Sequence, residues 1–433
     1  MSNSASEKSQ PVSKRLLPKG WLRRLGPGLV TGAADDDPSG IATYSQCGAQ
    51  FGLKLLWTIL LTTPLMIAIQ IVSARIGVAT RCGIAENMRQ RFSLATTITL
   101  VTLLAIANTI NIGADIAAMA GVIQLFVKIP SFILALFLGL TTLWLQVKFS
   151  FKQYVRLLKW LTLSLFTYVG IIFTVEIPWK EVLLHTMLPS IEWQPRYFTA
   201  VVAILGTTIS PYLFFWQSAQ EVEEHEQKAK QAGGKSYATN APKELGRIKF
   251  DTVTGMLLSN AIAFFIILTT AVTLHSRGVT DIGTVAQAAE ALRPVAGNFA
   301  FALFALGILG TGLLSIPVLA GSAAYAWAGA RNCPCGLDKK PADAREFYLI
   351  IALAICVGVA LILLPLDPIR MLFWAAVING VISIPIMIAM IMIASSQAVM
   401  KAFTLSRRLR FFSWLTVAVV GIAVCGMIYQ LFN

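Results

Sequence analysis

Charged residues are scarce in this sequence. Only 13% of the 433 residues are Asp, Glu, Lys or Arg, whereas 56% are hydrophobic and the mean hydropathy is +0.70. An average soluble domain carries about 25% charged residues. The composition therefore excludes an ordinary soluble globular protein and indicates an all-α polytopic membrane protein.

Histidine and cysteine are also rare, with three and six residues. The cysteines form no disulfide framework, and the closest pair, Cys333 and Cys335, has a spacing that favours an incidental pair over a metal site. No nucleophile–base arrangement, phosphate loop or His-rich cluster is present. The sequence therefore predicts neither an enzyme nor a bound cofactor.

Apolar runs long enough to cross a bilayer as helices occur eleven times. They lie at 26–50, 53–74, 93–126, 131–147, 155–175, 197–224, 250–273, 299–326, 347–365, 369–396 and 411–431. We expect one transmembrane domain over 26–431. Residues 1–25 are expected to be a disordered cytoplasmic tail, because they are polar and basic and contain no signal peptide.

The basic residues, which give a net charge of +14, are distributed by side of the membrane. Most fall in the first 25 residues and in every second loop after them. The other loops keep only Lys54, Lys128, Lys180, Arg196, Arg277, Arg293 and Arg370. The positive-inside rule predicts a cell (inner) membrane protein with a cytoplasmic N-terminus and an outer C-terminus. The membrane topology then accounts for the excess of positive charge. The lipid bilayer is the expected partner, and no nucleic acid or obligate protein partner is expected.

Three consecutive carboxylates, Asp35, Asp36 and Asp37, interrupt the first apolar run, directly before Pro38 and Gly40. An ionised carboxylate at bilayer depth persists where a cation or a water-filled path compensates it. Proline removes a backbone donor and glycine weakens a helix, so a break would leave free carbonyls beside the acids. The segment predicts a cation site.

A second break is expected in the sixth run, where Pro211 follows hydroxyl residues. Broken spans at matching positions of two halves are typical of inverted-repeat transporters with a midplane site. Considered alone, Pro211 could be a kink without function. The two five-helix repeats and the extra helix would be 26–175, 197–396 and 411–431.

A polar cluster follows the sixth run. Its members are Glu221, Glu223, Glu224, His225 and Glu226. A solvated helix end is the favoured interpretation, and attraction of a metal leaving the pore is the alternative.

Several of these motifs together resemble a known family. The segment 26–56, with Gly-Pro-Gly, an Asp-Pro turn and Gly-Ala-Gln-Phe-Gly, resembles the first span of Nramp divalent-metal transporters. The Ser-Pro break at 210–211 and Gly-Ala-Asp at 113–115 match as well, and the similarity covers nearly the whole chain. The resemblance implies a LeuT-like fold with two inverted five-helix repeats plus one helix, and metal transport by alternating access.

The sequence departs from the family pattern at the metal-site positions. The usual Asp-Pro-Gly-Asn reads Asp-Pro-Ser-Gly at 37–40, so Gly40 replaces Asn. The usual Met-Pro-His reads Ser-Pro-Tyr at 210–212, so Tyr212 replaces His. In the third span, Ala118 stands where the family pattern has a Glu that is associated with proton transfer. This combination resembles the Nramp-related magnesium transporters.

The changed ligands favour a hard cation. A thioether suits softer transition metals, whereas carboxylate, carbonyl and hydroxyl oxygens suit Mg²⁺. Mg²⁺ gives up water reluctantly, and the smaller residues leave room for retained water. We expect a partly hydrated Mg²⁺, with Mn²⁺ also accepted, carried as substrate. The expected ligands are Asp37, then Asp36 and Asp35, with carbonyls near Thr207 and Thr208, and Ser210 directly or through water.

Four further residues are expected at a gate or around the ligands. They are Gly40, Tyr212, Asp115 and Asn379. Alternatively, Asp36 caps a broken helix or lines the vestibule, Asp115 pairs with Asn108 or Asn111, and Asn379 makes an ordinary helix–helix hydrogen bond.

Proton coupling is not expected, because Tyr212 replaces the sixth-span His, and His185, His225 and His275 lie in or near loops. The membrane potential supplies about 4.6 kcal/mol per 100 mV for a dication, twice the 2.3 per elementary charge.

The nearest rival is a proton-coupled Mn²⁺/Fe²⁺ importer of the ordinary Nramp type. A sodium-coupled amino-acid transporter is disfavoured because the acids repel a carboxylate, and a metal-sensing receptor because no sizeable soluble domain exists.

Overall fold

The fold is built from helices in the part of the chain that the structure describes. The computed structural model describes residues 26–148, 163–231, 241–364 and 367–432. Within these ranges no strand occurs, which confirms the all-α architecture expected from the sequence. The expected tail over 1–25 lies outside the described residues.

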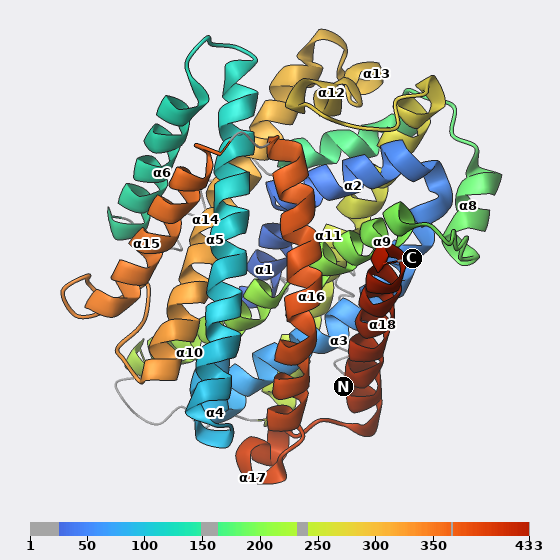
Figure 1. Ribbon diagram of the computed structural model, residues 1–433. Helices are drawn as coiled ribbons and strands as arrows, with labels where there is room; N and C mark the ends of the chain where they lie inside the picture. The colour runs from blue at the N-terminus through green and yellow to red at the C-terminus, as the bar shows by residue number, and fades with distance from the viewer. Residues whose placement is uncertain (1–25, 149–162, 232–240, 365–366, 433) are drawn as a thin grey trace, which may run out of the picture.

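The long helices α5, α14 and α16 lie side by side, with α12 and α13 at one end of the molecule and α4 and α17 at the other (Figure 1). The α-helices are α1 (Pro27–Asp35), α2 (Pro38–Phe51), α3 (Leu56–Thr80), α4 (Ile84–Arg91), α5 (Leu94–Gln124), α6 (Ser131–Lys148), α8 (Trp179–Met187), α9 (Pro195–Thr208), α10 (Pro211–Gln231), α11 (Ala241–Thr273), α12 (Val285–Glu290), α13 (Arg293–Ala296), α14 (Ala300–Arg331), α15 (Arg345–Leu361), α16 (Pro368–Ala394), α17 (Gln397–Met400) and α18 (Arg407–Phe432). The 3₁₀ helices are η2 (Gly52–Leu55), η3 (Leu163–Phe173), η4 (His275–Arg277), η5 (Gly297–Phe299) and η6 (Lys401–Phe403).

Eight helical stretches in the described part of the chain are long and apolar enough to cross a membrane, judged by length and composition. The sequence predicts eleven spans. Three of the expected spans give shorter helices, because α1 has 9 residues, α15 has 17, and the fifth run contributes only the 11 residues of η3 to the described part. The count of eleven therefore stays a prediction.

Both predicted helix breaks are present. α1 ends at Asp35 and α2 begins at Pro38, whereas α9 ends at Thr208 and α10 begins at Pro211. Proline is well tolerated in the first turn of a helix, where its missing N–H would have no intrahelical partner. Each of these two prolines therefore starts a helix immediately after the preceding one has ended.

The core is formed by the helices next to the two breaks. Nearly every residue of α2 and α9 is buried. α1 packs directly against α11, and a Cβ atom at Gly32 would overlap the backbone of Gly255. α9 packs equally closely against α16, since a Cβ atom at Gly206 would overlap the Ala376 carbonyl. Glycine at these positions brings four helix backbones close to the breaks.

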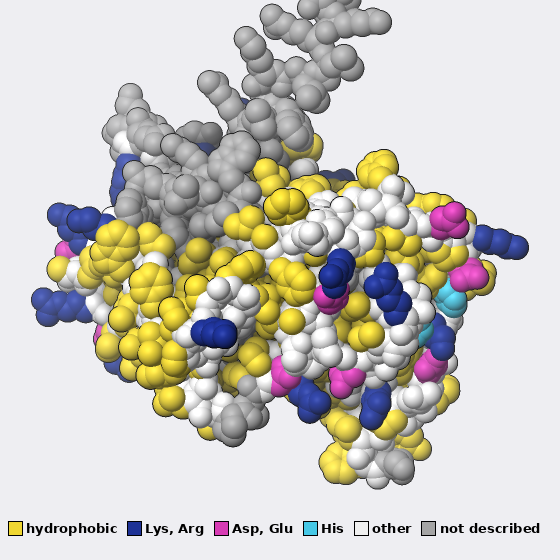
Figure 2. All heavy atoms as spheres, turned by 90° about the horizontal axis from the view of Figure 1, so that it is seen from above, with side chains coloured by type: hydrophobic (Ala, Val, Ile, Leu, Met, Phe, Trp, Pro, Cys, Tyr) yellow, Lys and Arg dark blue, Asp and Glu magenta, His cyan; other side chains and the backbone are white. Residues whose placement is uncertain are grey.

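The end of the molecule that carries α12 and α13 has charged side chains of both signs, scattered among hydrophobic ones (Figure 2). This is the end that the sequence predicts to be outside. Along the flanks, large apolar side chains such as Phe137 of α6 and Ile422 of α18 are exposed. A flank of this kind is expected of a protein whose surface contacts lipid.

Candidate metal-ion site

The break between α1 and α2 places Asp37 at the start of α2. Its Oδ1 accepts a hydrogen bond of 2.7 Å from the backbone N–H of Gly40, so Asp37 is the N-cap of α2. Aspartate is among the preferred N-cap residues, because its oxygen satisfies a backbone donor that the helix leaves unpaired. The sequence left open that Asp36 caps the broken helix, and Asp36 is indeed the C-cap residue of α1, whereas Asp37 is the N-cap of α2.

The second oxygen of Asp37 faces two other helices. Oδ2 accepts from the Asn111 side chain of α5 at 3.1 Å and lies 3.2 Å from the Tyr212 hydroxyl of α10. The same hydroxyl lies 3.1 Å from the Ala34 carbonyl, and its single proton can serve only one of these acceptors at a time. Asp37 is only 2% exposed. It is held by neutral donors from three helices.

Asp35 and Asp36 face a different helix from Asp37. Ser259 Oγ of α11 lies 2.6 Å from Asp35 Oδ2 and 3.1 Å from Asp36 Oδ1. Among the described residues, no three His, Cys, Asp or Glu side chains lie close enough together to hold a metal ion. The three consecutive acids are thus divided, and a metal at Asp37 would depend on carbonyl, hydroxyl or water oxygens for its other ligands.

The break between α9 and α10 supplies oxygens of this kind. A Cβ atom at Gly40 would lie 3.3 Å from both the Thr207 hydroxyl and the Asp35 carbonyl, so the two breaks meet at Gly40. The hydroxyls of Thr208 and Ser210 donate to carbonyls of α9, at 2.8 Å and 2.7 Å for their shortest bonds. Both hydroxyl protons are therefore used within the helix, and the oxygen lone pairs remain free to accept or to bind a cation.

The remaining predicted residues are buried in neighbouring helices. The Asp115 carboxylate accepts a hydrogen bond of 2.8 Å from the Ser315 hydroxyl of α14. A pairing with Asn108 or Asn111 is therefore wrong, since Asn108 bonds to α14 and Asn111 to Asp37. Asn379 of α16 is buried, and its Oδ1 has no hydrogen-bond partner among the described residues. Whether these residues form a gate stays a prediction.

Two partners of the acids at the break were not expected in that role, since Asn111 was named only as a possible partner of Asp115 and Ser259 was not named. Asn111 lies four residues before Asp115, on the same face of α5, so helical spacing could have associated it with the site. Ser259 carries no comparable signal, because a single serine in an apolar helix is common and only the packing of α1 against α11 brings it to the acids.

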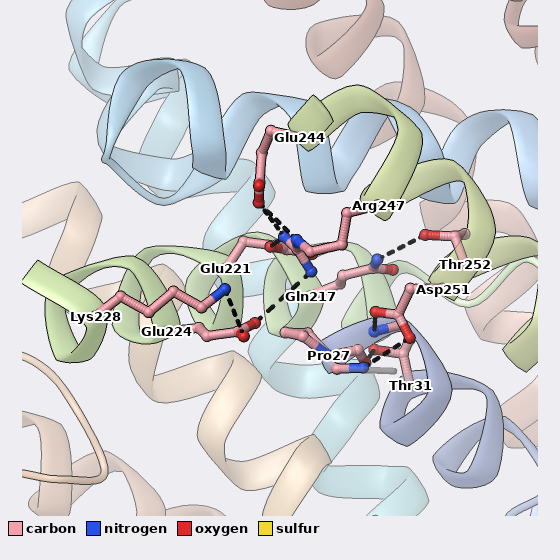
Figure 3. Close-up of polar contacts among 12 residues, drawn as sticks. Pro27, Thr31, Gln217, Glu221, Glu224, Lys228, Glu244, Arg247, Asp251 and Thr252 are labelled. Carbon is pink, nitrogen blue, oxygen red and sulfur yellow. Dashed lines mark hydrogen bonds and ion pairs between the residues drawn. The ribbon is translucent and has the colours of Figure 1, made fainter. Parts of the chain in front are cut away.

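A separate cluster of charges lies where α10 and α11 meet (Figure 3). We call it the Arg247 cluster, and it comprises Arg247, Glu221, Glu224 and Glu244. Arg247 forms ion pairs with Glu221, with Glu244 at 2.6 Å and with Glu224 at 3.7 Å. Glu221 is only 1% exposed, so the predicted solvated helix end is wrong for this residue. Glu221 and Glu224 of α10 thus bind a residue of α11, and Glu244 supports that residue from within α11.

One turn after Arg247, Asp251 binds the start of α1 (Figure 3). Its carboxylate accepts from the backbone N–H groups of Gly26 and Gly28, both at 2.8 Å, and of Leu29 at 3.1 Å. These are N–H groups that a helix cannot pair internally, and the helix dipole adds to their attraction for an anion. Asp251 thereby fastens the N-terminus of α1 to α11.

The cysteines of the described residues are free thiols. Burial raises the pKa of the Cys335 thiol to about 11 and that of the Cys82 thiol to about 12. Among the described residues, no group of three His, Cys, Asp or Glu side chains around these thiols could hold a metal ion. This supports the interpretation of Cys333 and Cys335 as an incidental pair.

The chain was compared with known proteins. The family model described as Natural resistance-associated macrophage protein-like matches residues 28–430. The divalent metal cation transporter MntH of Yersinia pestis (strain Pestoides F) is 26% identical over 315 residues, 71% of this chain and 73% of that protein. The MntH protein of Deinococcus radiodurans is 27% identical over 314 residues, 70% of this chain and 67% of that protein.

The fold was also compared with solved structures. The crystal structure of the Eremococcus coleocola manganese transporter, in complex with an aromatic bis-isothiourea compound, has a TM-score of 0.73. At 20% identity, the match covers 99% of this chain and 89% of that one. These similarities confirm the fold expected from the sequence.

Proposed function

The chain belongs to the Nramp family, and on that premise we propose that it is a membrane transporter of divalent metal cations that carries Mg²⁺ and also Mn²⁺. The observation that carries the proposal is Asp37, a buried carboxylate at a helix break that is held only by neutral donors. A buried anion of this kind is stabilised when a cation binds. The metal is substrate, and neither a cofactor nor an enzymatic activity is proposed.

The preference for Mg²⁺ is supported by the chemistry around the two breaks. Gly40 and Ser210 stand where the family pattern has Asn and Met, so neither position offers a sulfur or a large side chain. The nearby groups are the hydroxyls of Thr207, Thr208 and Ser210. Oxygen ligands and space for retained water favour a hard, hydrated cation. Asp35 and Asp36 would add negative charge from the side of α11.

We further propose that transport is not coupled to protons. The side chains that hydrogen-bond Asp37 are an amide and a phenol. Asp115, the remaining acid of α5, is bonded to Ser315 and not to Asp37. A proton relay needs titratable groups in sequence. The membrane potential alone would then drive the dication inward.

The proposed topology follows the positive-inside rule. The N-terminus is cytoplasmic, the C-terminus is outside, and the transporter occupies a cell (inner) membrane. The proposed divisions of the single domain are two repeats and one extra helix, at 26–175, 197–396 and 411–431.

A proton-coupled Mn²⁺ importer is the second candidate. It is favoured by the names of the similar proteins, which are a divalent metal cation transporter and a manganese transporter. The two candidates differ in their response to Mg²⁺. Millimolar Mg²⁺ should compete with Mn²⁺ uptake if the site is hard and hydrated, and should leave Mn²⁺ uptake unchanged if it is not.

The test is Mg²⁺ and Mn²⁺ flux into proteoliposomes that contain an indicator for metal and a second one for pH. We expect wild-type flux of both ions without acidification of the lumen, and loss of both fluxes in Asp37→Asn. Asp343→Asn, at an exposed loop residue, is the matched control and should transport normally. If millimolar Mg²⁺ leaves the Mn²⁺ flux unchanged and Mn²⁺ transport acidifies the lumen, the second candidate would replace this proposal.

A further inference from the structure

A cavity lies between α1, η3 and α11, beside the break between α1 and α2. Its volume is about 330 Å³, which is in the range of small-molecule sites. Two polar residues, Asp36 and Ser259, line it together with Gly32. Its other lining residues are apolar, and they are Leu29, Ala33, Leu163, Leu165, Phe166, Leu258 and Ile262.

The polar end of the cavity has an excess of acceptors over donors. Ser259 has one hydroxyl proton and lies closer to Asp35, at 2.6 Å, than to Asp36, at 3.1 Å. When the proton is donated to Asp35, Asp36 receives none from Ser259. Asp36 is 3% exposed and lines the cavity, whereas Asp35, the nearer acceptor of the Ser259 hydroxyl, does not line it. This end therefore attracts a donor that carries positive charge.

The walls exclude a hydrated metal ion. Leu163, Phe166 and Leu258 are partly exposed and apolar, so the cavity opens at an apolar part of the surface. A hydrated dication would lose its water there and gain no ligand until it reached Asp36. The cavity thus suits a molecule that is cationic at one end and apolar over the rest of its surface.

We propose that this cavity binds a lipophilic primary ammonium ion. Its ammonium group would donate hydrogen bonds to the Asp36 carboxylate and the Ser259 oxygen, and its hydrocarbon body would fill the apolar part. A primary ammonium has three N–H donors, which can be shared between the Asp36 carboxylate and the Ser259 oxygen, whereas a quaternary ammonium has none. A bound amine would connect α1 to α11 and neutralise Asp36, beside the metal site.

The binding half of this inference does not depend on which ion is carried. The expected slowing of metal transport by the amine does rest on the proposed function. Binding is therefore measured first, on purified protein without added metal, so that a failure of the amine site is distinguishable from a failure of the transport proposal.

The experiment compares 1-adamantylamine with 1-adamantanol, which has the same apolar body and no charge. We expect the amine to raise the Tm of the purified protein with a saturable dependence on concentration, and the alcohol to leave it unchanged. Equal shifts with both compounds would show partitioning into detergent or lipid and would overturn the proposal. In proteoliposomes, the amine should slow Mg²⁺ flux over the same concentration range.

Variants locate the site. Asp36→Asn keeps the size of the side chain and removes its charge, so the amine concentration at half-saturation should rise at least tenfold. Leu258→Trp fills the cavity without changing its polar end and should have a similar effect. Leu257→Trp is the matched control, because Leu257 is exposed on the same helix and does not line the cavity. Unchanged amine affinity in both Asp36→Asn and Leu258→Trp would refute the site.

Discussion

Two groups of buried carboxylates in this chain differ in how their charge is balanced. In the Arg247 cluster, Glu221 and its neighbours surround an arginine supplied by the protein itself. At the break, Asp35, Asp36 and Asp37 accept hydrogen bonds from neutral groups, and no ion pair with Lys or Arg involves them among the described residues.

Under the proposed function, this difference separates carboxylates that hold helices together from carboxylates that bind the transported ion. A carboxylate that is paired with an arginine of the same protein contributes to holding helices together, and its loss lowers the stability of the fold. A buried carboxylate without a countercharge can be compensated by a bound cation, and its loss would lower the affinity for that cation. The comparison predicts opposite outcomes for similar substitutions at the two places.

The largest effect on stability is expected for Arg247→Met. The substitution leaves Glu221 buried without its partner, so we expect a loss of about 3–5 kcal/mol in the free energy of unfolding, the usual cost of breaking a buried ion pair. Denaturation of the purified protein measures it. The double variant Arg247→Met with Glu221→Gln should recover part of the loss, and a double variant no more stable than the single one would show that the pair is not coupled.

Asp37→Asn should have the opposite profile. Without metal we expect the stability of wild type, because the amide oxygen can still accept from Gly40, and its NH2 group can donate to the unpaired Oδ1 of Asn111 once that amide rotates, while Tyr212 donates to Ala34. With Mg²⁺ at about 100 times its Kd, wild type should gain about 2.7 kcal/mol and the variant should gain little. The measurement is Tm with and without Mg²⁺, after removal of metal by a chelator. An equal gain in both proteins would place the metal elsewhere.

Asp251→Asn tests the fastening of α1 to α11. An amide accepts less strongly than a carboxylate and would turn a donor toward backbone N–H groups, so we expect a loss of about 1–3 kcal/mol. Hydrogen exchange should accelerate at the amides of Gly28 and Leu29, which Asp251 now binds. Asp343→Asn, at an exposed position, is the control and should leave these amides unchanged.

The smallest effect is expected for Ser210→Met, which adds a thioether beside the break. Sulfur ligands favour softer ions, so the ratio of Mn²⁺ to Mg²⁺ transport should rise about tenfold, which corresponds to about 1.4 kcal/mol. Competition of the two ions for uptake measures this ratio. Ser210→Ala, which removes the hydroxyl without adding sulfur, is the matched control. An unchanged ratio in Ser210→Met would mean that residue 210 does not contact the ion.

The sequence predicted the features that depend on local chemistry. Asp and Pro together mark a helix end and a helix start, and both breaks lie where Pro38 and Pro211 place them. Tyr212 lies beside Asp37, and whether the two residues serve an ion site stays a prediction. The sequence could not show which way each acid points, because this depends on where the helix stops between Asp35 and Asp37.

The long-range partners were not predictable in the same way. Asp251 binds residues more than 220 positions earlier in the chain, and Ser259 does the same with Asp35 and Asp36. Glu221 looked like part of a solvated helix end because the sequence around it is polar, but it is buried and pairs with Arg247 of α11. Such contacts are set by the packing of α1 and α10 against α11, for which a single sequence offers no pattern.

The Tyr212 hydroxyl has one consequence for how an arriving ion is sensed. A cation at Asp37 would repel the phenolic proton, which then has the Ala34 carbonyl as its alternative acceptor, 3.1 Å away. Ala34 belongs to the last turn of α1, so occupancy of the site would commit to that helix a proton that now lies within reach of both acceptors. An empty and a loaded transporter would thus differ in how firmly the end of α1 is attached to α10.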